Sequence, residues 1–278
     1  MRIIVFSKMF QQYEIDGLVF LGRDLGTEGW DLAVRKGHPV NPENVEHALP
    51  LAAKRLAESD QPVLAVTGET SLLYPTTPYA EPLLRAMDVA NVRILKLGYF
   101  LFDPAKGDYW QEVDNVRRAL DGWQKLARRY HVKVVYHTHS GMGYMGLNAA
   151  ALMHLLRDFD PTAVGAYLDA GHLVVNGEPF ALALAMVKPY LAMVGLKDYK
   201  PILQPSGDEQ KLQWECVPAG QGGVAWGEVF RLLVKEGFAG PCSVHAEFNA
   251  PPGASFVKMA QAEVAYLKRK RDIATGRA

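Results

Sequence analysis

Eight short apolar runs, each followed by a longer stretch with helical periodicity, constrain the fold of this chain more than any other feature. The runs cover residues 3–6, 30–34, 63–67, 92–97, 132–136, 163–168, 191–196 and 242–246. Between them, apolar residues recur at helical spacing, as at Val113, Val116 and Leu120. Because parallel strands need long crossover connections, this alternation predicts a parallel sheet covered by helices.

Chain length decides between an open doubly wound sheet and a closed barrel. Eight strand–helix units in 278 residues match a (β/α)8 barrel, and no change in composition marks a domain boundary. We therefore predict an α/β protein with one domain, residues 1–278, folded as a single (β/α)8 TIM barrel. Residues 199–224, rich in Pro and Gly, form the longest stretch without periodicity and are expected to be an irregular loop, functional or disordered.

Composition excludes several classes of partner. Basic and acidic residues number 30 each, so the formal net charge is zero, which argues against binding to nucleic-acid phosphates. Cys216 and Cys242 are the two cysteines, too few for a disulfide framework. No apolar run reaches the length of a membrane span, and no signal-peptide pattern precedes the first run. We expect a cytoplasmic protein with a small-molecule substrate, no nucleic-acid or membrane partner, and a homo-oligomeric state left open.

Ionisable side chains gather at the ends of the last four predicted strands. In chain order they are His137, His139, Asp169, His172, Lys197, His245 and Glu247. The carboxyl ends of barrel strands form the face on which active sites lie. Because burial of such groups without a purpose carries a desolvation cost, we predict a functional pocket at this end of the barrel.

Several segments resemble the xylose isomerase-like TIM barrel superfamily of sugar phosphate isomerases and epimerases. One is residues 164–172, which read Val-Gly-Ala-Tyr-Leu-Asp-Ala-Gly-His; the others are residues 196–198, 217–226 and 237–241. The match covers most of the chain in the expected order. Residues 30–40 also resemble a segment in one branch of this superfamily. That likeness makes Arg35 and His38 candidates for substrate contacts, unless they only brace the second loop.

The resemblance implies a divalent metal ion, which better-understood members hold with Glu, Asp, His and Glu on strands five to eight. Only Asp169 is retained here, because His137, Gly195 and His245 stand at the other three positions. Two imidazoles and a carboxylate suit Zn, Mn or Fe better than Mg. We therefore predict a metal site formed by His137, Asp169 and His245, although the usual pair of proton-moving glutamates is absent from its positions.

The resemblance and these residues together predict a sugar isomerase or epimerase that abstracts the proton α to the carbonyl of a keto sugar with the help of the metal. Glu247 is the remaining carboxylate base near the predicted metal. His139 or Lys197 would donate to the developing oxyanion. His172 would hold a substrate hydroxyl.

Other interpretations stay open at this point. Expulsion of a β-substituent after the same proton abstraction would make the protein a lyase acting on a keto sugar or glycoside. The altered ligand positions also allow a non-catalytic sugar-binding barrel, since fold does not imply function. The endonuclease IV branch shares the fold, but the neutral charge opposes a DNA-facing surface. Glu247 is either the base or an ion-pair partner that braces Lys197.

Overall fold

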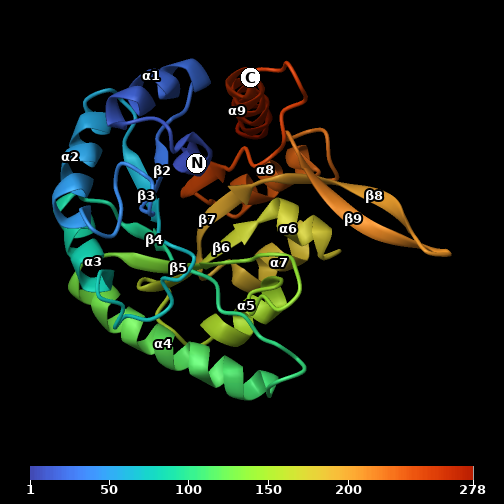
Figure 1. Ribbon diagram of the computed structural model, residues 1–278, viewed down its shortest axis with the longest axis horizontal. Coiled ribbons are helices and arrows are strands. Elements are labelled where there is room, and N and C mark those ends of the chain that lie inside the picture. Colours follow the sequence, from blue (N-terminus) through green and yellow to red (C-terminus); the bar gives the residue numbers. More distant parts are fainter. Residues whose placement is uncertain (278) are drawn as a thin grey trace.

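The computed structural model describes residues 1–277 and has at its centre a closed barrel of eight parallel strands (Figure 1). The barrel strands are β1 (Arg2–Phe6), β2 (Trp30–Ala33), β3 (Val63–Thr67), β4 (Ile94–Lys96), β5 (Lys133–His137), β6 (Val164–Asp169), β7 (Leu191–Leu196) and β10 (Pro241–Val244). Their order is β1-β10-β7-β6-β5-β4-β3-β2, and β1 also pairs with β2, which closes the sheet. The predicted (β/α)8 barrel is confirmed.

Helices cover the outside of the barrel, as the helical periodicity between the strands predicts (Figure 1). They are α1 (Ile15–Leu25), α2 (Val45–Ala57), α3 (Ala80–Val89), α4 (Tyr109–Arg129), α5 (Ala149–Leu156), α6 (Ala170–Val175), α7 (Phe180–Val187), α8 (Trp226–Lys235) and α9 (Phe256–Ala274), with a 3-10 turn η1 (Ser7–Phe10) after β1. The longest, α4, begins where the Asp108 carboxylate accepts the Gln111 amide hydrogen at 2.8 Å. It buries Val116, Leu120 and Trp123 against the sheet.

The core has two layers. A large one lies between the sheet and the surrounding helices. A small one is formed by Ile4, Ala65, Val135, Tyr167 and Met193, which come from five different barrel strands and pack against one another. Side chains of this kind fill the interior of a (β/α)8 barrel. The candidate functional side chains lie between this layer and the carboxyl ends of the strands.

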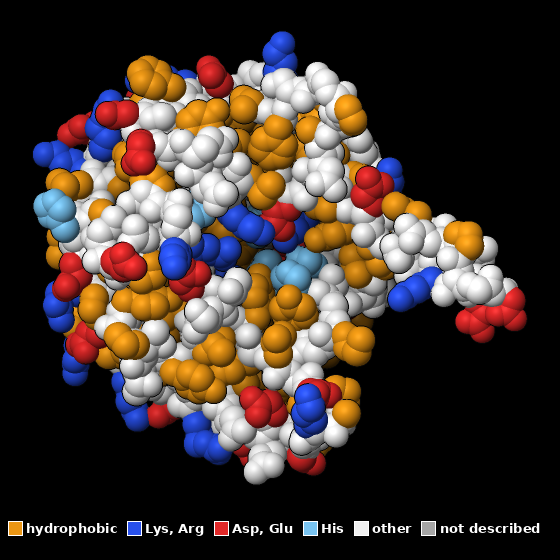
Figure 2. All heavy atoms as spheres, viewed as in Figure 1, with side chains coloured by type: hydrophobic (Ala, Val, Ile, Leu, Met, Phe, Trp, Pro, Cys, Tyr) orange, Lys and Arg blue, Asp and Glu red, His pale blue; other side chains and the backbone are white. Residues whose placement is uncertain are grey.

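Residues 198–217 form a β-hairpin, so the prediction of an irregular loop over residues 199–224 was wrong for most of its length. Strands β8 (Asp198–Ser206) and β9 (Glu209–Val217) pair in antiparallel register from Asp198 opposite Val217 to Ser206 opposite Glu209. The hairpin projects from the body of the molecule (Figure 2). Because most of its residues are exposed on both faces, it lacks the apolar alternation that marks a half-buried strand.

The buried carboxylate of Asp198 fixes the chain where the hairpin returns to the barrel. It accepts hydrogen bonds of 2.9–3.2 Å from the backbone amides of Tyr199, Gly220, Gly222 and Val224 and from the Trp226 indole. A Cβ on Gly222 would lie 2.2 Å from Asp198 Oδ1, which explains the glycine there. The glycine-rich segment 217–226 is therefore wrapped around this carboxylate, next in the chain to Lys197.

Glu263 on α9 supports the same segment, and its ionisation makes the stability of the fold depend on pH. Its Oε1 accepts the Ala219 amide hydrogen at 2.9 Å, its Oε2 has no partner within residues 1–277, and burial raises the pKa of this carboxyl to about 8. Between the ordinary carboxyl pKa and about 8, the folded chain keeps a proton that the unfolded chain has lost. Stability therefore falls as pH rises through this window, by up to about 1.4 kcal/mol per pH unit.

Glu263→Gln should raise the free energy of unfolding by about 1–3 kcal/mol at about pH 7.5, and by much less at about pH 4.5. The amide keeps an acceptor for Ala219 and removes the group that ionises. Urea unfolding of both proteins at the two pH values measures the difference, with exposed Glu58→Gln as the matched control. A gain for Glu263→Gln that is equal at both pH values would contradict the assignment.

Candidate active site

A cavity of about 460 Å³ opens at the carboxyl end of the barrel strands. Figure 2 shows basic, acidic and histidine side chains together in a hollow near the centre of the molecule. Its ionisable lining comes from loops or strand ends that follow β1, β2, β4, β5, β7 and β10, namely Lys8, Arg35, Lys96, His139, Lys197, His245 and Glu247. The aromatic rings of Tyr99, Tyr144 and Tyr167 complete the wall.

The predicted site residues do not all reach this cavity. Arg35, His139, Lys197, His245 and Glu247 line it, whereas His137, Asp169 and His172 are buried beside its lining residues. His38 does not line the cavity; it is buried in the turn after β2, where its amide donates to the Arg35 carbonyl. His38 therefore fits the bracing role, while Arg35 donates from Nε to the Gly68 carbonyl at 3.0 Å with its guanidinium over the Phe6 ring.

Asp169 ends β6 and anchors the groups beside it. Its Oδ1 accepts the backbone amide hydrogens of Gly171 and His172, which caps the short helix α6. Its Oδ2 lies 3.2 Å from Nε2 of His137. Because a carboxylate only accepts, His137 Nε2 carries the hydrogen, and Nδ1 is left to accept the Tyr99 hydroxyl hydrogen at 2.8 Å. Both ring nitrogens of His137 therefore take part in hydrogen bonds.

His139 and His172 form a second pair, with ring centroids 4.0 Å apart. His139 Nδ1 lies 2.8 Å from the Ser140 carbonyl, so Nδ1 carries the hydrogen and Nε2 keeps a lone pair. Ser140 Oγ contacts His172 Nδ1 at 2.7 Å. Burial, reinforced by Lys197, lowers the pKa of His139 to about 4, so its ring is uncharged at neutral pH.

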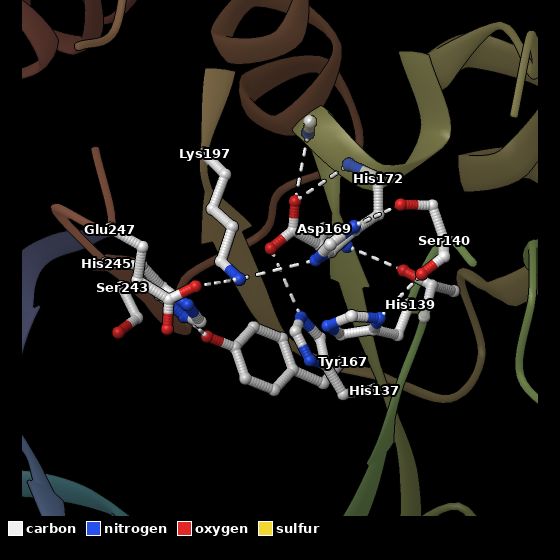
Figure 3. Close-up of polar contacts among 12 residues, drawn as sticks. His137, His139, Ser140, Tyr167, Asp169, His172, Lys197, Ser243, His245 and Glu247 are labelled. Atoms are coloured by element: carbon white, nitrogen blue, oxygen red, sulfur yellow. Dashed lines mark hydrogen bonds and ion pairs between the residues drawn. The ribbon is translucent and has the colours of Figure 1, made fainter. Parts of the chain in front are cut away.

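Lys197 and Glu247 are the charged centre of the site (Figure 3). Lys197 Nζ lies 2.5 Å from Glu247 Oε2 and 3.3 Å from His172 Nε2, and Glu247 Oε1 also pairs with Lys8 Nζ at 2.7 Å. Burial opposes the charge on Lys197, but Glu247 and Asp169 raise its pKa above the ordinary range. Burial likewise opposes ionisation of Glu247, but Lys197 and His245 hold its pKa well below its usual range. Both groups are therefore charged at neutral pH.

The surroundings of a second buried lysine, Lys96, lower its pKa instead of raising it. Lys96 ends β4, lines the cavity and is 2% exposed, and its side-chain amine makes no hydrogen bond or ion pair within residues 1–277. Burial, reinforced by the charges of Arg35 and Lys197, holds the pKa of Lys96 well below its ordinary range. The Tyr99 ring, 3.5 Å from Nζ, stabilises an ammonium by about 2 kcal/mol, less than the several kcal/mol that its desolvation costs. The surroundings of Lys96 therefore favour its uncharged amine over the ammonium.

The residues present do not fit the divalent ion that we expected at His137, Asp169 and His245. The nitrogens of His137 are taken by Tyr99 and Asp169, and Nε2 of His245 contacts the Tyr167 hydroxyl at 2.6 Å. His245 Nδ1 is the one imidazole nitrogen that is buried without a partner in the described chain. No set of three His, Cys, Asp or Glu residues in positions 1–277 is arranged to hold a metal.

Two further features oppose a metal ion there. The Lys197 ammonium acts electrostatically on His137, Asp169 and His245 and would repel a metal cation held by them. Gly195 stands where the resemblance places a histidine ligand, and a Cβ at this position would lie 2.4 Å from Asp169 Oδ2. The backbone of β7 therefore packs against the carboxylate so closely that residue 195 has no room for a ligand side chain.

Sequence comparison identifies the family. A model of the xylose isomerase-like TIM barrel matches residues 76–270, and the chain belongs to that family. It is 28% identical over 171 residues to an inosose dehydratase of Clostridium tetani, which covers 59% of this chain and 56% of the relative. It is 29% identical over 145 residues to an inosose dehydratase of Bacillus anthracis, covering 49% and 48%. The chain thus spans about half the length of the curated relatives it matches.

Solved structures show the same fold along almost the whole chain. A D-tagatose 3-epimerase-like protein superimposes with a TM-score of 0.75 at 16% identity and covers 99% of both chains. A 3-keto-D-glucoside 4-epimerase from E. coli gives 0.75 at 14% identity, over 97% of this chain and 99% of the other. A probable 3-DHS dehydratase from Bacillus anthracis gives 0.70 at 13% identity, over 96% and 99%. None of the helices in residues 1–277 has the length and apolar composition of a membrane crossing.

Proposed function

We propose that this protein is an isomerase or epimerase of a keto sugar or sugar derivative that moves the α-proton without a resident metal ion. The observation that supports this most is the convergence of Lys197, Glu247 and His139 on one cavity. The relatives include inosose dehydratases, and the structural neighbours include several epimerases. Their names agree with a carbohydrate carbonyl compound as substrate. The polar lining of the cavity offers the hydrogen-bonding groups that such a substrate requires.

In this proposal, Lys197 stabilises the negative charge that develops on the carbonyl oxygen. A fixed ammonium in a buried site stabilises an enediolate more strongly than water does, because it is already oriented toward the oxygen. When the substrate oxygen takes the Lys197 hydrogen bond, Glu247 loses part of the interaction that lowers its pKa. The Glu247 carboxylate then becomes a stronger base for the α-proton.

His139 supplies a second proton-transfer group on the other side of the site. Figure 3 shows Glu247 and Lys197 on one side of the cluster and His139 with Ser140 on the other. The Ser140 carbonyl fixes the ring through Nδ1, so Nε2 is free to take a proton from solvent and give it to the face of the enediolate opposite Glu247. Inversion of a carbon centre requires proton transfer on opposite faces of the enediolate, so this arrangement favours epimerisation.

Dehydration is the second candidate function, because the relatives at 28–29% identity are inosose dehydratases. Proton abstraction by Glu247 is the common first step. Loss of a β-hydroxyl as water then requires an acid, and Glu247, which holds the abstracted proton, would provide it. The two reactions differ only in whether the proton returns to carbon or goes to the leaving oxygen.

The function is tested by incubating the protein with a panel of keto sugars and inososes in deuterated water. Exchange of the α-hydrogen with a change in configuration or in carbonyl position, followed by NMR, supports the isomerase or epimerase. Exchange with formation of an unsaturated ketone, followed by ultraviolet absorbance, identifies the dehydratase. Binding without exchange for any member of the panel would contradict both and favour a sugar-binding barrel.

Chelation should leave the protein unchanged. After dialysis against EDTA, we expect activity within about twofold of the untreated protein and the same melting temperature, because in this proposal Lys197 supplies the positive charge at the substrate oxygen. Elemental analysis of the same samples measures residual metal, and buffer dialysis is the control. Loss of activity that Mn or Zn restores would contradict this prediction.

A further inference from the structure

Lys96 is the lysine of the cavity lining that has neither a role in the proposed proton-transfer steps nor an ion-pair partner within residues 1–277. Three lysines line the cavity, and the other two are paired: Lys8 and Lys197 both contact Glu247. The Lys96 amine has neither a hydrogen bond nor an ion pair within residues 1–277. A long cationic side chain that is buried at a strand end without an anionic partner is uncommon in a core, so its placement calls for a chemical explanation.

Asp31 and Glu247 are the carboxylates whose charges raise the pKa of Lys96, and both bind other groups. Asp31 accepts the hydroxyl hydrogens of Thr67 and Ser243 at 2.7 and 3.0 Å, and Glu247 is shared between two other lysines. The cations that face Lys96 are Arg35 and Lys197. The surroundings therefore favour the free amine, and the amine lone pair is available because no described residue takes it.

We propose that Lys96 is a catalytic nucleophile that captures the substrate carbonyl as an imine. This inference rests on the proposed function, since it assumes that a carbonyl compound enters the same cavity. Desolvation and neighbouring cations favour the free amine of a lysine, which is the form that attacks carbonyl carbon. The Tyr99 ring, which contacts the Lys96 amine on one side, holds the side chain in the cavity wall.

The step balances without any added oxidant or reductant. Lys96 Nζ forms a bond to the carbonyl carbon, the carbonyl electron pair moves to oxygen, and the resulting hydroxyl leaves as water after it gains a proton. The iminium then accepts the electron pair of the α C–H bond as Glu247 takes the proton. Return of a proton to carbon and addition of water release the product and the amine. In this form Lys197 serves the departing and returning oxygen.

Reductive trapping tests the proposal in the intact protein. The protein is incubated with dihydroxyacetone and sodium cyanoborohydride at about pH 7, and modified lysines are located by peptide mass spectrometry. Because a lowered pKa raises the fraction of free amine, about tenfold for each pH unit, Lys96 should be modified about tenfold or more faster than exposed lysines such as Lys106. Modification of Lys96 no faster than exposed Lys106 would overturn the proposal.

Two variants make the assignment specific. Lys96→Met should lose the fast adduct, whereas Lys133→Met should keep it. Lys133 is the matched control because burial also lowers its pKa, but it begins β5 at the opposite end of the barrel. The comparison of lysines within the unmodified protein stands even if Lys96→Met does not fold.

Failure of this inference is distinguishable from failure of the proposed function. A protein that exchanges the α-hydrogen of a keto sugar but forms no Lys96 adduct keeps the proposed function and refutes the imine. A protein that traps dihydroxyacetone on Lys96 but exchanges no α-hydrogen across the panel supports the nucleophile and refutes the epimerase.

Discussion

Replacing Lys197 with Met should lower kcat/KM for the substrate found in the exchange panel by about two to three orders of magnitude. Met has nearly the same length but no charge, so the enediolate oxygen loses its fixed cation. The barrel should still fold, because Glu247 keeps its contact with Lys8 and Lys197 is not part of a strand. Initial rates and melting temperatures of the same preparations measure the two effects separately.

The matched control is Lys200→Met, the same substitution three residues further along the chain. Lys200 forms an exposed ion pair with Glu215 on the hairpin, at 2.8 Å. Exposed pairs contribute at most about 1 kcal/mol to stability, so this variant should keep activity within about twofold. Equal rates for Lys197→Met and the parent protein would show that Lys197 only braces Glu247.

Glu247→Gln should reduce turnover by about two to four orders of magnitude, because the amide keeps the size and hydrogen bonding of the side chain but cannot take the α-proton. Substrate affinity should change little. The variant should also shift the pH profile. Glu247 is the first of the groups that raise the pKa of Lys197, so its loss lowers that pKa, and the alkaline limb of residual activity should move to lower pH.

Glu215→Gln is the control for that variant, since Glu215 is a carboxylate in an exposed pair with lysine. A bracing role predicts a different pattern for Glu247→Gln, with a lower melting temperature and activity per folded molecule within about threefold of the parent. Initial rates measured from about pH 6 to pH 10 decide between the two patterns.

The barrel and the position of much of the site followed from the sequence because closure of the sheet makes strand ends meet. Asp169, Lys197 and Glu247 lie far apart in the chain, but β6, β7 and β10 are consecutive neighbours in the barrel. Strand β10 ends at Val244, and Ala246 has a φ of 48°, yet His245 and Glu247 both line the cavity. A rule that considers only the end of each strand was therefore sufficient to find them.

Charge states and free lone pairs depend on the neighbouring groups of each side chain, and they could not be predicted from strand ends. The rule applied to strands five to eight also applies to β4, whose last residue is Lys96, but a lysine within an apolar run gives no indication of its charge state. The metal prediction needed lone pairs on His137, and their direction depends on Tyr99 and Asp169. Residue types predict what a cluster can bind, whereas hydrogen bonds decide which atoms remain available.

The hairpin β8–β9 can change in length without a change in the position of the candidate site. Asp198 and Val217 pair at its base, so the chain leaves and re-enters the barrel at adjacent positions whatever the length between them. Insertions or deletions near Gly207, at the tip between Ser206 and Glu209, would change the reach of this arm without moving Lys197. During evolution, descendants of this chain can therefore lengthen, shorten or replace the hairpin to contact new partners while the residues that line the cavity keep their positions.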